Sequence, residues 1–138
     1  MKTTFQSTLK LDTTGGLLAL AISDEAPSSL PSALSAAFGA NLEGSLGDAE
    51  FKAKAGSSFS LRITGQIGAK WLLLVGAGDQ SANSYRQAAG AVGAFARRHG
   101  LEQVQFALGE YDNNSDKEIL RAVAEGLEEG NYSFDQYQ

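Results

Sequence analysis

The stretch Lys70-Trp71-Leu72-Leu73-Leu74-Val75-Gly76-Ala77-Gly78 joins a continuous apolar run to a short glycine-containing turn, and a segment rich in small residues follows it. An uninterrupted apolar strand is buried on both faces, as at the centre of a sheet that helices cover. Glycine lets the chain turn sharply where a side chain would obstruct it. The stretch therefore predicts a central strand, a tight turn and a helix.

The predicted helix has a recognisable start, buried face and end. Ser81 can cap it by accepting from the amides two or three residues further on. The basic last turn, Arg97-Arg98-His99, complements the helix dipole, and Gly100 is expected at the C′ position. Apolar residues at spacings of three and four predict one core-facing stripe, which consists of Tyr85, Ala88, Ala89, Val92 and Ala96.

Other strands are predicted from apolar runs and from alternation. Residues 17–22 are a second continuous apolar run, so we expect a second inner strand beside or near residues 71–75. Alternating apolar and polar residues predict four more strands, at 4–11 (on an edge or with one exposed face), 51–56, 58–63 and 103–108.

Two more helices complete the predicted fold. A short one is expected at 32–38. The last one begins at the capping box Ser115-Asp116-Lys117-Glu118 and ends at Gly130. Its apolar stripe is Ile119, Leu120, Val123, Ala124 and Leu127. This order of elements predicts an α/β domain with three layers, α/β/α, around a mixed sheet of about six strands.

Composition excludes several classes of protein. The 138 residues suit one domain, and they carry a formal net charge of −5 with no basic cluster larger than Arg97-Arg98. A nucleic-acid partner is therefore not expected, because such binding needs a basic face. With no cysteine and one histidine, disulfide scaffolds, thiolate metal sites and multi-histidine metal sites are excluded.

No targeting or membrane segment is expected. Met1-Lys2 is not followed by the apolar core of a signal peptide, and the longest apolar run is far shorter than the roughly 20 residues that span a bilayer. We therefore expect a cytoplasmic protein without a membrane partner.

The turn Gly76-Ala77-Gly78-Asp79-Gln80-Ser81 approximates the dinucleotide fingerprint G-x-G-x-x-G, with Ser81 in place of the third glycine. Glu110 ends the next predicted strand, further along than the fingerprint requires. The helix start could hold an anion. Because the motif is incomplete, we favour a simple strand-to-helix turn over a nucleotide site.

Three other candidate groups have simpler structural explanations. His99 beside Arg97-Arg98 could be a base next to an anion clamp, but a solvated helix end is favoured. Asp112, Asp116 and Glu118 could bind a cation, but they lack the glycine-spaced loop of a calcium site, and capping explains Glu118. Lys52 and Lys54 are expected on the solvent face of an edge strand.

The predicted helix between Ser81 and Gly100 is unusually smooth, since it is rich in alanine and contains Gly90 and Gly93. A glycine inside a helix costs about 1 kcal/mol relative to alanine, so close backbone approach must offset the loss. The partner could be the sheet or another helix, and we favour the sheet.

Four stretches together, in this order, resemble the amino-terminal domain of the leucyl (cytosol) aminopeptidase family. They are Phe51-Lys52-Ala53-Lys54-Ala55-Gly56, Trp71 to Gly78, Arg86-Gln87-Ala88-Ala89-Gly90, and Glu125-Gly126-Leu127 running into Gly130-Asn131-Tyr132-Ser133-Phe134-Asp135-Gln136-Tyr137. The last stretch is the most specific. Ala53 departs from the glycine that members often carry there, which bears on a turn rather than on chemistry.

This resemblance implies a macro-domain-like fold for residues 1–130, with residues 131–138 starting the connection to a carboxy-terminal catalytic domain. It also implies a hexameric hydrolase, a metallopeptidase that removes N-terminal amino acids using two divalent metals (zinc, manganese or magnesium). The family's metal ligands and catalytic residues lie in that following domain. No catalytic, cofactor or metal residue can therefore be assigned here, and this chain alone is not expected to be an enzyme.

Under this resemblance the expected role is assembly or regulation of the catalytic domain. The alternative is a small-molecule binding module of macro-like fold that takes a nucleotide or ADP-ribose at the turn 76–81. The typical early Gly-Asp pair and asparagine-rich loop of macro domains are absent from the sequence, so that alternative is an analogy of fold alone. A DNA-binding accessory role would need a basic face, which the acidic balance disfavours.

Overall fold

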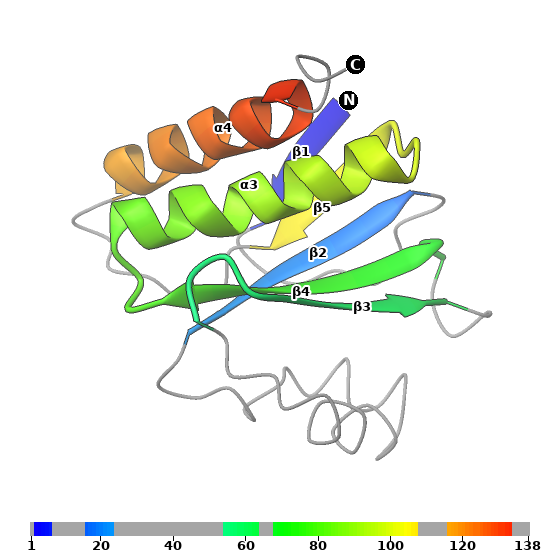
Figure 1. Cartoon of the computed structure of the whole chain (residues 1–138), viewed down its shortest axis with the longest axis horizontal. Helices are drawn as coiled ribbons and strands as arrows, with labels where there is room; N and C mark the ends of the chain where they lie inside the picture. The colour runs from blue at the N-terminus through cyan, green and yellow to red at the C-terminus, as the bar shows by residue number, and fades with distance from the viewer. Residues whose placement is uncertain (1, 7–15, 24–53, 64–67, 108–115, 134–138) are drawn as a thin grey trace.

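A computed structural model describes residues 2–6, 16–23, 54–63, 68–107 and 116–133. These residues form one mixed sheet with two helices (Figure 1). The elements in chain order are β1 (Lys2–Gln6), β2 (Leu17–Ser23), β3 (Ser58–Arg62), β4 (Trp71–Gly78), α3 (Ala82–Arg98), β5 (Gln103–Ala107) and α4 (Asp116–Ser133).

The five strands lie in the order β1-β5-β2-β4-β3. The pairs β1–β5, β5–β2 and β2–β4 are parallel, and β3 adds to β4 in the antiparallel direction. The predicted placement of the two apolar runs is confirmed, because β2 and β4 are neighbours with Leu17 opposite Trp71 and Ala21 opposite Val75. β1 lies at an edge of the described sheet, which is one of the two placements that its alternating sequence predicted.

Both faces of the central strands are buried, as continuous apolar runs require. On one face Leu17, Leu73 and Phe106 pack with α3 and α4 into one core cluster. On the other face Leu18, Leu72 and Leu74 form a second cluster with Ile63 and other residues. Both described helices cover the first face. The predicted helix at 32–38 lies outside the described residues. The described residues therefore show two of the three expected layers, the sheet and one layer of helices.

α3 begins and ends as predicted. The Ser81 hydroxyl oxygen accepts from the Ser84 amide at 3.2 Å. At the other end Gly100 has a φ of 63°, its amide donates to the Arg97 carbonyl, and the Leu101 amide donates to the Ala96 carbonyl at 2.8 Å. This pair of bonds is a Schellman motif, which satisfies carbonyls that the helix leaves unpaired. All five residues of the predicted apolar stripe of α3 are buried.

Three predictions about α4 are corrected. Leu120 is 40% exposed and Ala124 is exposed, whereas Ala122 is buried beside Ile119, Val123 and Leu127. The helix also continues past Gly130 to Ser133. Gly130 does not end it because this glycine lies against the backbone of Gly90 rather than in a left-handed turn. Residues 131–133 are therefore helical, although we expected them in the connection that follows the domain.

Two further predictions are wrong within the described residues. They are the strand at 51–56 and the count of about six strands. Residues 54–57 make a turn, in which the Ser57 amide and hydroxyl both donate to the Lys54 carbonyl. The described residues contribute five strands. Residues 51–53 lie outside the described part, as do 7–11 of the first predicted strand and Leu108 of the last.

Candidate functional site

The turn between β4 and α3 is organised by the side chain of Asp79. Its carboxylate accepts from the Ser84 hydroxyl at 2.7 Å and from the Ser81 amide at 3.0 Å. Ser81 and Ser84 are joined in turn through their hydroxyls at 3.0 Å. Two residues of the turn adopt a left-handed backbone, Gly78 at a φ of 53° and Gln80 at 64°. The first turn of the helix is thus capped by the chain's own side chains.

These hydrogen bonds change the acidity of Asp79. The bond from the Ser84 hydroxyl, followed by the bond from the Ser81 amide, holds the pKa of the Asp79 carboxyl below its ordinary value. The carboxylate is therefore charged at neutral pH and lies at the helix start, where an incoming phosphate would need to bind. A negative charge in this place opposes a second anion, so the geometry agrees with a structural turn and gives no support to a nucleotide site.

The turn of residues 54–57 closes over the end of β4. The Gly76 amide donates to the Ser57 carbonyl at 2.8 Å, and the Gly56 amide donates to the Gly76 carbonyl at 3.3 Å. A side chain at Gly78 would lie 3.2 Å from Ala55, so this glycine is required by close packing as well as by its φ. The glycines of the turn 76–81 therefore serve contact between two segments of the chain.

The smooth face of α3 packs against α4, and our expectation that it lies tight on the sheet is wrong. A Cβ atom at Gly93 would overlap the Leu127 carbonyl oxygen and lie 2.9 Å from the Asn131 amide nitrogen. Equivalent atoms at Gly126 and Gly130 would overlap the carbonyl oxygens of Arg86 and Gly90. Three glycines thus let the backbones of two helices touch, which no larger residue permits. We call this contact the glycine seam, after Gly93, Gly126 and Gly130.

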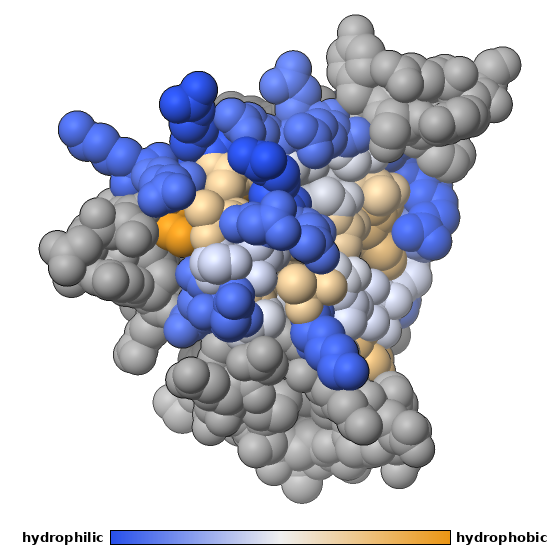
Figure 2. Space-filling model, turned by 60° about the vertical axis from the view of Figure 1, so that its left-hand side comes forward, coloured by the Kyte–Doolittle hydropathy of each residue, from blue (hydrophilic) through white to orange (hydrophobic). Residues whose placement is uncertain are grey.

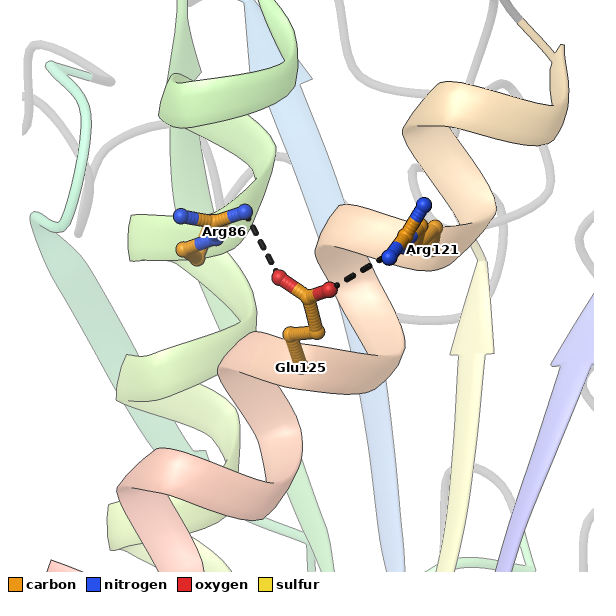
Figure 3. A network of polar contacts seen from close by, with 3 residues as sticks. All are labelled: Arg86, Arg121 and Glu125. Atoms are coloured by element: carbon orange, nitrogen blue, oxygen red, sulfur yellow. Dashed lines mark hydrogen bonds and ion pairs between the residues drawn. The ribbon is translucent and has the colours of Figure 1, made fainter.

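One ion pair crosses the glycine seam on its solvent side (Figure 3). Arg86 of α3 donates to the Glu125 carboxylate of α4 at 2.7 Å, and Arg121 donates to the other oxygen of the same carboxylate at 3.2 Å. The Arg86 and Glu125 side chains are 43% and 40% exposed, so the pair contributes about 0–1 kcal/mol. The ion pair therefore supplies only a small part of the stability of the two packed helices.

The surface over the amino ends of the helices is mainly polar. Figure 2 shows hydrophilic side chains between and around small apolar areas on this side of the molecule. Among the described residues, the large hydrophobic side chain that is exposed is that of Leu120.

His99 has a partner that the sequence did not indicate. It is the C-cap residue of α3, and its ring lies 4.2 Å from the Phe95 ring and 4.8 Å from the Trp71 ring, measured between centroids. The four-residue spacing of Phe95 and His99 could have indicated their contact, since such residues are neighbours on a helix. The contact with Trp71 depends on the fold. His99 is exposed, as a solvated helix end should be.

The structure does not assemble the candidate cation site. Glu118 is exposed on α4, Asp116 begins that helix, and Asp112 lies outside the described residues, as does Glu110. Within the described ranges no three His, Cys, Asp or Glu side chains come together as metal ligands would. Lys54 is exposed in its turn, and Lys52 is not described. Among the helices described, none is long and apolar enough to cross a membrane.

The four stretches that carry the family resemblance meet in one connected region. The first stretch contacts the second through Gly56 and Gly76, and a side chain at Gly56 would lie 3.6 Å from the Gln87 amide oxygen in the third. The third contacts the fourth along the glycine seam and through the Arg86–Glu125 ion pair. The similar residues thus maintain contacts between segments, and none of the contacts described is a catalytic constellation.

Comparison with known proteins agrees with this resemblance. The family model described as "Cytosol aminopeptidase family, N-terminal domain" matches residues 18–138. A search of curated proteins finds no match. The family match begins at the second residue of β2 and includes β3 to α4, with the glycine seam and the capped turn at Asp79. The chain therefore belongs to the cytosol aminopeptidase family, as the N-terminal domain of that family.

Proposed function

We propose that this domain is a non-catalytic part of a cytoplasmic leucyl aminopeptidase and that it shapes and steadies the assembly of a catalytic domain joined after α4. In this proposal the parent enzyme removes N-terminal amino acids from peptides, uses two divalent metals (zinc, manganese or magnesium) held in that catalytic domain, and works as a hexamer. The family membership supports the parent activity, and the architecture of α4 supports the role given to this domain.

The observation that carries the proposal is the glycine seam. The last two turns of α4 lie with their backbone against the backbone of α3, which itself packs on the central strands through Tyr85, Ala88 and Val92. Such contacts leave little freedom for one helix to slide or rotate on the other, because no flexible side chain separates them. The described end of α4 is thereby held firmly on α3, and in this proposal that rigid pair of helices steadies the domain that follows.

The chemistry of the described residues gives independent support. A two-metal hydrolase holds its cations about 3.5–4 Å apart between several ligands and places the attacking water on them. Among the described residues, Asp79 instead caps a helix and Glu125 forms a surface ion pair, and no three His, Cys, Asp or Glu side chains come together. The roles of Asp79 and Glu125 are structural, and in this proposal the hydrolysis belongs to the domain that follows.

Activity measurements on two forms of the protein test this proposal. We expect the purified 138-residue chain to leave leucine-p-nitroanilide intact, even with added zinc or manganese. We expect turnover when the domain encoded downstream of Gln138 is attached, and a lower rate or a smaller assembly when residues 1–130 are deleted from that longer protein. Metal-dependent turnover by the 138-residue chain, lost on mutation of its own acidic residues, would overturn the proposal. A reading frame without a metal-ligand-rich downstream domain would also overturn it.

Ligand binding separates this proposal from a nucleotide-binding module. We expect no measurable affinity of the chain for NAD, ADP-ribose or duplex DNA at physiological salt, since Asp79 is charged at the helix start and the chain carries a net charge of −5. Isothermal calorimetry measures this directly. Micromolar binding that Gly78→Val abolishes would favour the binding module instead.

A further inference from the structure

We draw no further inference here: the strongest candidate, the half-buried aromatic patch at the amino end of β4 where the Trp71 ring lies between the Arg62 guanidinium and the His99 ring, is made of side chains that contact one another, and nothing in the described part of the chain shows what partner would cover it.

Discussion

Replacing Gly93 with alanine is expected to destabilise the domain, whereas the same change at Gly90, one turn earlier in α3, is expected to stabilise it. The two positions differ in what an added methyl group would meet. At Gly90 the nearest atom is the Gly126 carbonyl oxygen at 3.8 Å, which is ordinary van der Waals contact. At Gly93 the methyl group would overlap the Leu127 carbonyl oxygen and press on the Asn131 amide nitrogen.

The magnitudes follow from helix propensity and packing. Alanine gains about 1 kcal/mol over glycine inside a helix, and this gain applies at both positions. Overpacking costs about 1–3 kcal/mol and falls at the upper end here, because the atoms in contact with Gly93 belong to the backbone and cannot rotate away. We therefore expect Gly93→Ala to lower the free energy of unfolding by about 2 kcal/mol and Gly90→Ala to raise it by about 0.5–1 kcal/mol.

Urea denaturation of the 138-residue chain, followed by far-UV circular dichroism, measures both changes. For a domain of this size each kcal/mol corresponds to roughly 4 °C in Tm, so thermal melts should move in opposite directions by about 8 °C down and 2–4 °C up. Gly90→Ala is the matched control for Gly93→Ala, because both substitutions carry the same gain in helix propensity, and the wild-type chain is the reference for both. Shifts of the same sign and similar size would refute the argument that the glycine seam, rather than the sheet, requires Gly93.

Three further changes test the core, the capped turn and the ion pair. Leu73→Asp should prevent folding, because Leu73 is fully buried and an unpaired charge there costs several kcal/mol; a soluble variant with native circular dichroism and unchanged Tm would contradict the placement of β4. Asp79→Asn should reduce stability at pH 7. The lowered pKa of Asp79 in the folded state gives stability that is present above its ordinary value of 3.8 and is lost as the pH falls through the folded pKa, so urea melts of variant and wild type should converge at the acid end. Glu125→Gln should cost no more than about 1 kcal/mol, and 1 M salt should shrink the difference; a salt-independent loss of several kcal/mol would show that the pair with Arg86 is not a surface interaction.

The sequence by itself determined the local elements around the centre of the fold. Continuous apolar runs identified β2 and β4 as inner strands, because a strand that is apolar at every position must be covered on both faces. Ser81 and Gly100 marked the ends of α3, since capping and left-handed turns depend on one residue and its near neighbours. The acidic balance and the incomplete fingerprint disfavoured a nucleotide site, and the charge of Asp79 at the helix start agrees with that interpretation.

Only the tertiary structure decided which backbone Gly93 and Gly130 contact. The sequence of the helix allowed Gly93 to face either the sheet or another helix, and Gly130 had the sequence signature of a helix end. The choice depends on residues more than 30 positions apart, because a glycine in close contact is recognised only by the backbone that touches it. The meeting of Arg62, Trp71 and His99 is of the same kind, since two strands and a helix must assemble before those side chains become neighbours. Local pattern determines a residue's secondary structure and the side of its element that is apolar, whereas the partner of that side is set by the packing of the whole chain.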